Sequence, residues 1–199
     1  MRNRLGLASL AFALTLAGSA FATPLEDAGA AYKRGDYATA MRLIRPLAEQ
    51  GNTAAGYNLG TIYYNGEGTR RDYAEALKWY RMAAEHGDVE SARRAGFMYA
   101  NGQGVPRDEA EALRWYRIAA DRGDAEAQNN LGVIYSDGNG VPANLVEATK
   151  WFKVAAARFS ASEKEKRDKA MKNSDLLAKK MTPTQVAEAD KLAREWKPK

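Results

Sequence analysis

Residues 89–124 read VESARRAGFMYANGQGVPRDEAEALRWYRIAADRGD. The 36 residues before them, 53–88, read TAAGYNLGTIYYNGEGTRRDYAEALKWYRMAAEHGD, and residues 125–159 read AEAQNNLGVIYSDGNGVPANLVEATKWFKVAAARF. The three copies align without a gap. A fixed period of this length is the signature of a repeat array, in which each unit buries its core against its neighbours. Tryptophan recurs with the same period, at Trp79, Trp115 and Trp151.

Each copy predicts two α-helices. In the copy 53–88 the first helix has an apolar side at helical spacing, and we expect it to end at the Asn65-Gly66-Glu67-Gly68 turn, where glycine permits positive φ. The second helix carries an apolar stripe at i, i+3, i+4, i+7 and i+8, which indicates one buried face. The first helix contributes Leu59, Ile62 and Tyr63, and the second contributes Ala76, Trp79, Tyr80, Ala83 and Ala84.

The second helices begin with an acidic or amide residue that is followed three residues later by glutamate. This spacing predicts a capping box, in which the first side chain accepts a hydrogen bond from the helix backbone and the glutamate reaches back to the N-cap amide. The pairs are Asp72–Glu75, Asp108–Glu111 and Asn144–Glu147.

A glycine also recurs in the middle of each first helix, where it costs about 1 kcal/mol relative to alanine. Its recurrence predicts that another helix crosses so closely that a Cβ atom would clash. The three glycines are Gly60, Gly96 and Gly132.

The repeats, 53–88, 89–124 and 125–160, are flanked by two atypical segments, as terminal repeats usually are. Residues 23–52 form a partial N-terminal repeat, because the run from Gly35 to Ala40 matches the start of a second helix. Residues 161–199 are expected to form a C-terminal cap of two helices. The first of these has Ala170, Met171, Leu176 and Leu177 as its expected apolar side, and the second follows a Thr182-Pro183-Thr184-Gln185 capping sequence.

Residues 1–22 are typical of a secretory signal peptide. Arg2 and Arg4 precede an apolar run, and Ala20-Phe21-Ala22 supplies the small-x-small pattern that a signal peptidase recognises. We expect cleavage after Ala22 and a periplasmic or secreted protein. An uncleaved membrane anchor is the alternative, although the run is marginal for the ~20 apolar residues that span a bilayer.

Charge is unevenly distributed along the chain. Residues 23–157 carry 16 lysines and arginines against 18 acidic residues, whereas residues 158–199 carry 12 against 7. Such a basic C-terminal region can make weak contact with anionic lipid headgroups, but interleaved lysine and glutamate are more typical of an ordinary solvated helix face. Nucleic acid is not an expected partner of an exported protein. The absence of cysteine excludes disulfides and thiolate zinc sites.

Taken together, these residues resemble the Sel1-like repeat, a relative of the tetratricopeptide repeat. The shared pattern is L-G-x-x-Y-x-x-G-x-G-V-P followed by x-x-A-x-x-W-Y-R-x-A-A-x-x-G-D, and the likeness covers roughly residues 35–158. The first copy departs from it at Thr69-Arg70-Arg71, where Val-Pro is usual. The resemblance implies an all-α fold, a right-handed α-solenoid of antiparallel helix pairs. It also implies an adaptor that holds protein partners, and it implies no catalytic residues.

The sequence carries no recognisable catalytic motif. His86 is the only histidine, and it lies in the last turn of a helix, where a donor or cation stabilises the C-terminus. No nucleophile pattern converges on it, and no phosphate-binding or zinc motif occurs. Oxygen ligands at Asp137 and Asn139 do not match the spacing of a calcium-binding EF-hand. We therefore expect no enzyme activity, no cofactor and no metal site.

A partner is expected on the concave face of the solenoid, which first helices line. Arg93, Arg94 and Phe97 form the least ordinary cluster there, because arginine and aromatic residues are enriched at interface hot spots. Asn58, Arg94 and Asn130 share one phase, which predicts a polar track that can hold a peptide. Each single residue can equally be a solvated residue or a contact between repeats. The candidates are Tyr57, Asn58, Thr61, Tyr64, Arg93, Arg94, Phe97, Asn129, Asn130 and Val133.

These observations favour an exported protein–protein interaction scaffold of the bacterial envelope, which binds a protein or peptide partner. A hydrolase or an enzyme accessory factor that acts on the cell wall is the alternative from another class. A protein held at a membrane surface by its basic C-terminal region is a third interpretation.

Overall fold

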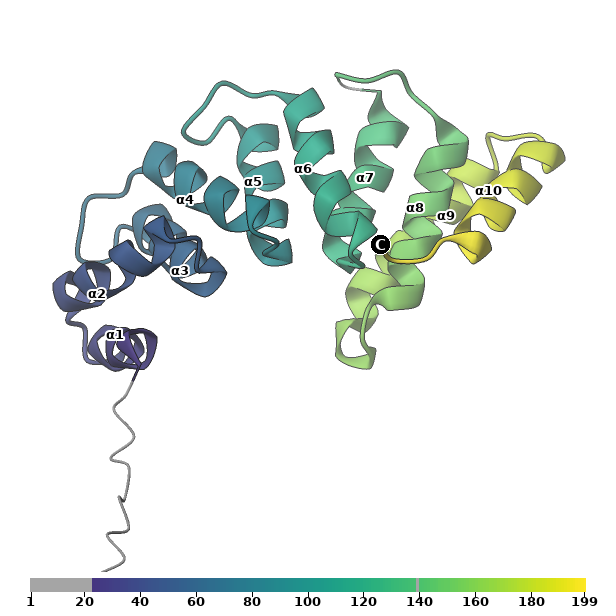
Figure 1. Ribbon diagram of the computed structural model, residues 1–199. Coiled ribbons are helices and arrows are strands. Elements are labelled where there is room, and N and C mark those ends of the chain that lie inside the picture. Colours follow the sequence, from purple (N-terminus) through teal and green to yellow (C-terminus); the bar gives the residue numbers. More distant parts are fainter. Residues whose placement is uncertain (1–22, 139) are drawn as a thin grey trace, which may run out of the picture.

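The computed structural model describes residues 23–138 and 140–199. All regular elements in these two ranges are helical, with ten α-helices and one 3-10 turn (Figure 1). The proposed signal peptide, residues 1–22, lies outside the described residues. The helices are α1 (Pro24–Lys33), α2 (Tyr37–Glu49), α3 (Thr53–Asn65), α4 (Tyr73–Glu85), α5 (Val89–Asn101), α6 (Glu109–Asp121), α7 (Ala125–Asp137), α8 (Leu145–Arg158), η1 (Ala161–Glu163), α9 (Lys164–Ala178) and α10 (Pro183–Glu195).

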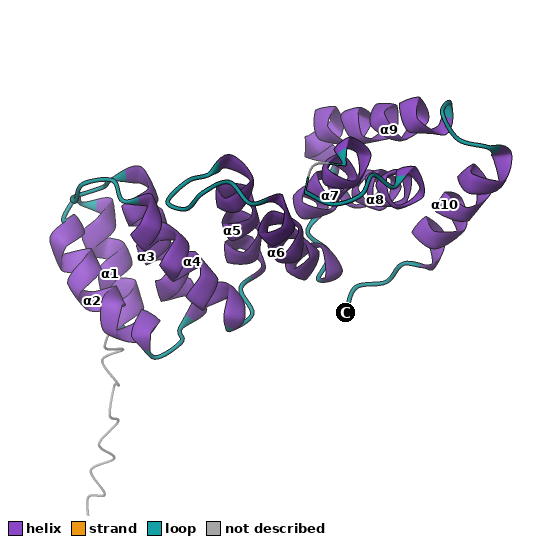
Figure 2. Ribbon diagram, turned by 90° about the horizontal axis from the view of Figure 1, so that it is seen from above, coloured by secondary structure: helices purple, strands orange, loops and turns teal. Residues whose placement is uncertain are grey.

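Helices α1 to α8 form four antiparallel pairs that stack in chain order along a curved array (Figures 1 and 2). Each second helix packs against its own first helix and against the first helix of the next pair. The prediction of an all-α solenoid is therefore confirmed. Among the described helices, none combines the length and the apolar character that a membrane crossing requires.

The glycine within each first helix lies against an aromatic ring of the second helix of the same pair. A Cβ atom added to Gly60 would lie 2.8 Å from the ring of Tyr80, and one added to Gly96 would lie 2.8 Å from the ring of Tyr116. Gly132 has the same relation to Phe152. The predicted close crossing of helices is confirmed, and its cause is a bulky ring on the partner helix.

Buried tryptophans join each helix pair to the pair before it. Trp79, Trp115 and Trp151 are at most 1% exposed, and an arginine of the preceding second helix lies over each indole. The same arginine donates a hydrogen bond to a tyrosine hydroxyl of the first helix between them, so it links three helices. These arginine–tyrosine pairs are Arg45–Tyr63, Arg81–Tyr99 and Arg117–Tyr135.

The predicted capping boxes of the second helices are only half present. Asp108 accepts a hydrogen bond from the backbone of Glu111, as expected. The Glu111 carboxylate does not reach back to the N-cap amide, and it accepts a 3.1 Å hydrogen bond from Nε1 of Trp115. The prediction was wrong at this point because a buried indole N–H needs an acceptor more than the exposed end of the helix does. Equivalent bonds join Trp79 to Glu75 and Trp151 to Glu147.

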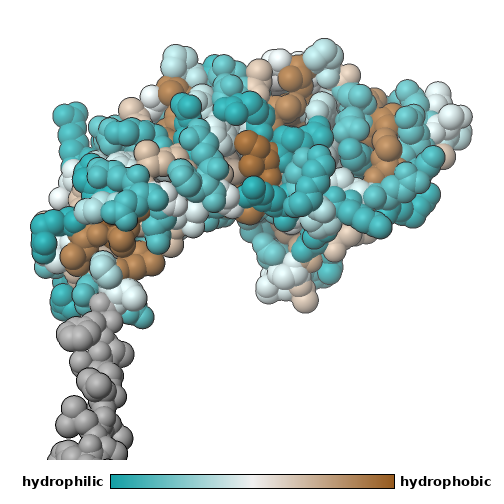
Figure 3. Space-filling view, in the orientation of Figure 1, coloured by the Kyte–Doolittle hydropathy of each residue, from teal (hydrophilic) through white to brown (hydrophobic). Residues whose placement is uncertain are grey.

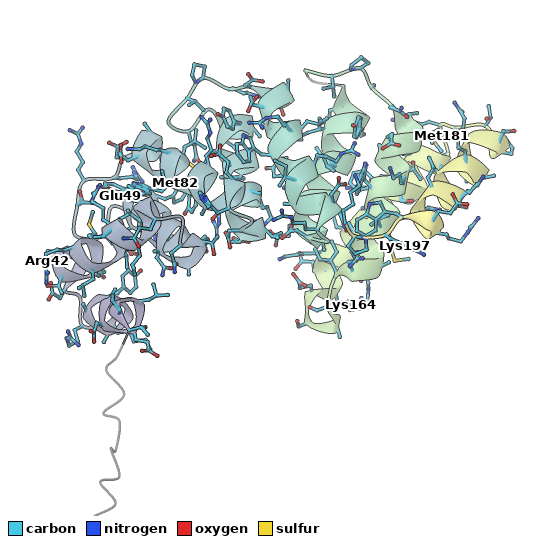
Figure 4. The ribbon with its side chains drawn as sticks, viewed as in Figure 1. Arg42, Glu49, Met82, Lys164, Met181 and Lys197 are labelled. Carbon is cyan, nitrogen blue, oxygen red and sulfur yellow. The ribbon has the colours of Figure 1, made fainter. Side chains whose placement is uncertain are left out.

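The C-terminal helices do not form a further regular pair. Both α9 and α10 pack on α8, and Figure 2 shows them diverging from each other. Met181 lies at the turn between them, and Lys197 follows the end of α10 (Figure 4). The capping box of Thr182 and Gln185 is confirmed. Directly after α10, Trp196 meets Trp151 edge to face with 6.0 Å between ring centroids.

The expected apolar side of α9 was partly wrong. Ala170 and Leu177 are buried as predicted, but Met171 is 52% exposed and Leu176 is 47% exposed. Because α10 packs on α8 and leaves much of α9 uncovered, only a narrow stripe of α9 is buried. Ser174 belongs to that buried stripe, although it was not predicted.

Candidate functional site

We call the outward side of the first helices α1, α3, α5 and α7 the first-helix face, and the predicted partner-binding residues lie on α3, α5 and α7. Within the three repeats, two large hydrophobic side chains are classed as exposed among the described residues. Phe97 on α5 is 40% exposed and Val133 on α7 is 38% exposed. They occupy the same position in consecutive copies, where α3 has the polar Thr61.

Arg93 is held by carboxylates on two sides. It contacts Glu90 one turn earlier on α5, with 2.5 Å between Nη2 and Oε1, and it reaches Glu126 on α7 at 2.6 Å. Asp124, the N-cap of α7, lies 3.6 Å away. Although burial opposes it, the Glu90 contact holds the pKa of Arg93 above its ordinary value. Arg93 therefore ties two repeats together and is committed to contacts within the chain.

Two of the three carboxylates around Arg93, those of Glu90 and Asp124, have pKa values shifted in opposite directions. Burial alone would raise the pKa of Glu90, but hydrogen bonds from Arg93 and Arg94 lower it below its ordinary value. Burial raises the pKa of Asp124. Arg93 lies 3.6 Å away, so its positive charge offsets only part of the effect of burial. Arg94 bonds Glu90 at 2.9 Å and keeps 38% of its side chain exposed, so it remains accessible to a partner.

A tyrosine cluster lies beside Arg94. The rings of Tyr57 and Tyr80 are 5.9 Å apart, and the Thr61 hydroxyl lies 3.1 Å from the Tyr80 hydroxyl. Burial raises the pKa of Tyr80 to about 12, so this hydroxyl stays neutral at physiological pH. Further along α3, Tyr64 packs against Tyr73 and donates a hydrogen bond to Gln103 of the next pair. Tyr57, Thr61 and Tyr64 thus act partly as contacts within the array.

The predicted asparagines lie at different depths. Asn58 is exposed, whereas Asn129 and Asn130 are half-buried. Asn130 lines the same hollow as Tyr116, and burial is the main cause that raises the pKa of the Tyr116 hydroxyl. The polar track of Asn58, Arg94 and Asn130 stays a prediction, and its central residue is ion-paired to Glu90.

Two hollows contain members of this set. The first, the N-terminal groove, has a volume of about 220 Å³ and lies among α1, α2 and α3. The second, the central groove, has a volume of about 210 Å³ and lies among α5, α6 and α7. Asn58 and Thr61 contribute to the N-terminal groove, and Asn130 and Val133 contribute to the central groove. Figure 3 shows that apolar surface gathers over the N-terminal helices.

Among the described residues, no three or more His, Cys, Asp and Glu side chains are grouped so that they could hold a metal ion. His86 is the C-cap residue of α4, and its Nδ1 lies 2.9 Å from the carbonyl oxygen of Met82. Its ring also lies against Gly51 of the preceding pair. The predicted role of His86 at a helix C-terminus agrees with this geometry.

Sequence reasoning missed several residues of this face. Tyr32 and Lys33 of α1 line the N-terminal groove, although their segment was assigned only a capping role. Glu90 was also missed as the residue that pairs with both arginines. Its spacing of three and four residues from Arg93 and Arg94 is the signal that identifies such pairs on a helix.

Comparison with known proteins agrees with this architecture. A family model described as "Sel1 repeat" matches residues 53–88, 89–124 and 125–158, just over half of the chain. A solved Sel1 repeat protein from Oxalobacter formigenes is 26% identical, with a TM-score of 0.63, over 85% of this chain and 74% of its own. A protective antigen of uropathogenic Escherichia coli with an SLR fold is 26% identical, with a TM-score of 0.48, over 84% of this chain and 44% of its own. No curated protein matches the sequence.

Proposed function

Because the chain belongs to the Sel1 repeat family, we propose that it is an exported scaffold that binds a protein or peptide partner on its first-helix face. Relatives that hold protein partners make this the expectation for the family. The partner, the place in the envelope and the absence of catalysis are parts of the same proposal.

The observation that carries the proposal is the exposure of Phe97 and Val133. Both are large apolar residues of the kind that normally lies in a core. The other large apolar residues of the repeats are buried or half-buried. Covering a large hydrophobic side chain contributes about 1.5–3 kcal/mol, so one on each of two consecutive first helices gives a partner a substantial apolar anchor. Arg94, three residues before Phe97 on α5, supplies a charged donor, and aromatic residues with arginine are typical of interface hot spots.

A scaffold is favoured over a cell-wall hydrolase or an enzyme accessory factor by the chemistry of the titratable groups. The strongest cluster, Arg93 with Glu90, Asp124 and Glu126, is an ion-pair network that links two repeats. Its carboxylates are held by Arg93, whereas glycoside hydrolysis requires a pair of carboxyl groups that flank the substrate. Turnover of purified muropeptides that follows the protein through purification would refute the non-catalytic part.

Export is proposed from the basic start, apolar run and Ala20-Phe21-Ala22 site of residues 1–22. The test is the intact mass and N-terminal sequence of the protein isolated from fractionated cells. We expect a chain that begins at Thr23 outside the cytoplasm. A chain that keeps its first residues in the cytoplasm would contradict export without affecting the binding proposal.

The partner is sought by affinity capture from an envelope extract, with cross-linking and mass spectrometry. We compare the mature chain with a Phe97→Ala/Val133→Ala variant and with a control, Met171→Ala/Leu176→Ala, which removes exposed apolar side chains elsewhere. We expect one protein that the mature chain and the control retain and the first variant loses. Equal capture by all three forms would place binding away from the first-helix face.

A second candidate function, contact with an anionic membrane surface, is favoured by the outward side of α9 and the turn that follows it. Four lysines there form no ion pair with any residue of the described ranges, and Leu176 lies exposed among them. Sedimentation with phosphatidylserine vesicles should occur at low salt and disappear at high salt, because screening removes such attraction. The lysines are Lys169, Lys172, Lys179 and Lys180.

A further inference from the structure

The N-terminal groove and the central groove lie at equivalent places in the array, two repeats apart. Five residues that line one groove lie 72 residues from five that line the other, which is twice the repeat period. Each groove is opened by an alanine of a first helix and bordered by an asparagine of the next first helix. The matching pairs are Ala28 and Ala100, Ile44 and Tyr116, Asn58 and Asn130, Thr61 and Val133, and Ile62 and Ile134.

The intervening position, one repeat from each groove, carries larger residues. Tyr64 stands where the grooves have alanine, and Arg94 stands where they have asparagine. Tyr64 is fixed by Tyr73 and Gln103, and Arg94 is fixed by Glu90. These side chains occupy the space that is open in the neighbouring repeats, so the first-helix face alternates between hollow, ridge and hollow.

The two grooves differ in chemistry. The N-terminal groove has an apolar lining of Ala28, Ala40, Ile44 and Ile62, with Lys33 as its charged residue. Lys33 is exposed and forms no ion pair with any described residue, so its charge disfavours the entry of a second cationic side chain.

The central groove has the opposite charge balance. Arg107 at its rim is paired with Glu109, which leaves the exposed carboxylate of Asp137 without an ion-pair partner in the described part of the chain. A cationic side chain is attracted here, and it can also donate a hydrogen bond to the amide oxygen of Asn130.

We propose that the first-helix face binds an extended segment of a partner protein through two anchor residues. A large aliphatic side chain enters the N-terminal groove, and a lysine or arginine side chain enters the central groove. The segment passes over the ridge of Tyr64 and Arg94 and covers Phe97. This inference rests on the proposed function and adds to it the chemistry, the order and the spacing of the anchors.

The probes are synthetic peptides with one leucine and one lysine, separated by four to ten serine and threonine residues, which span about 13–33 Å when extended. Binding to the mature chain is measured by fluorescence anisotropy. We expect one spacer length to bind best, and replacement of leucine by serine or of lysine by glutamate to weaken that peptide at least tenfold. If no leucine–lysine peptide binds better than an all-serine and threonine control, the proposal is overturned.

The grooves are then filled with the residues that the chain itself carries on the ridge. Ala28→Tyr/Asn58→Arg should abolish the preference for leucine and keep the preference for lysine, and Ala100→Tyr/Asn130→Arg should do the reverse. Should either double variant lose its helical circular dichroism, the single exposed substitutions Asn58→Arg and Asp137→Asn replace it. Unchanged preferences in folded variants would refute the two-groove inference.

The converse variant, Tyr64→Ala/Arg94→Asn, should open a hollow at the ridge and shift the best spacer to a shorter length. Failure of this inference is distinguishable from failure of the proposed function. If capture of a cellular partner depends on Phe97 and Val133 while peptide binding does not depend on the grooves, the proposed scaffold function is retained and only the two-groove inference is refuted.

Discussion

The indole Nε1 of Trp115 donates a 3.1 Å hydrogen bond to the carboxylate of Glu111, one turn earlier on α6. The same glutamate is the third residue of the helix, and its backbone N–H is capped by Asp108. One residue therefore joins the start of the second helix to the most buried aromatic side chain of the repeat. The bond recurs in all three repeats.

Replacing Glu111 by alanine should lower the free energy of unfolding by about 1–3 kcal/mol, because the buried indole N–H loses its acceptor. Replacement by glutamine should cost less, since an amide oxygen can still accept the bond. Urea unfolding measures both. The control is Glu165→Ala on the outer side of α9, where a change within about 0.5 kcal/mol is expected. Equal losses for Glu111→Ala and the control would show that the bond contributes nothing.

Gly96→Ala should destabilise the protein although alanine is the better helix former. The added methyl would lie 2.8 Å from the Tyr116 ring, and overpacking of this kind costs about 1–3 kcal/mol. Gly29→Ala in α1 is the matched substitution, because no atom lies within 4 Å of its added methyl. There we expect a gain of about 0.5–1 kcal/mol. Thermal unfolding of the two variants compares them, and a gain at both sites would disprove the close crossing.

Trp196→Ala should release α10 from α8. The Trp196 indole meets Trp151 edge to face, and Cζ of Arg158 lies 4.5 Å from the centroid of the Trp196 ring. Loss of the indole should therefore lower the free energy of unfolding by about 2 kcal/mol. Hydrogen exchange should become faster in residues 183–195, with little change in α3 to α6. Unchanged exchange in α10 would mean that Lys153–Asp190 and the tail contacts hold this helix by themselves.

The Arg93 network predicts a pH dependence with a definite sign. The pKa of Glu90 is lowered in the folded protein despite its burial, because Arg93 and Arg94 bond it, so its ionised form stabilises the fold. That contribution is complete above the unfolded-state pKa, near 4.5, and is lost as the pH falls through the lower folded-state pKa. Glu90→Gln should therefore cost about 1 kcal/mol at pH 7 and progressively less in acid, with the modest value set by solvent screening.

Asp124 should behave in the opposite sense. Burial raises its pKa in the folded protein, so its stabilising contribution is present below the unfolded-state pKa and is lost as the pH rises through the folded-state pKa. The difference in unfolding free energy between the wild type and Asp124→Asn should thus move against the wild type as pH rises from 3 to 6. Parallel pH profiles for Glu90→Gln and Asp124→Asn would contradict this assignment.

Features that repeat along the chain could be predicted, because each is local and is stated three times. Gly60 and its equivalents indicated a close crossing, and the structure supplies the aromatic ring that makes glycine necessary. The Glu111 side chain was assigned to the helix start, and it serves Trp115 four residues later on the same helix. Both partners were visible in the sequence, but the need of a buried indole for an acceptor depends on burial, which spacing alone does not state.

Features at the ends of the array and between repeats could not be predicted in this way. Met171 and Leu176 follow a helical apolar pattern, yet they are exposed because α10 turns back onto α8. Arg93 was selected as a partner-binding residue for its charge, and its carboxylate partners come from α5 and α7 together.

The 36-residue period by itself determined the helix pairs, their order and the close crossing of helices at the glycine of each first helix, because these depend on residues less than one repeat apart. Only the tertiary structure decided which side chains stay exposed and where the face is hollow. Ala28 and Asn58 border one groove although they lie 30 residues apart, and their distance in space is set by how consecutive pairs pack. The physical reason is that a surface belongs to the stacked array, and a hollow exists only where two neighbouring repeats both present small side chains.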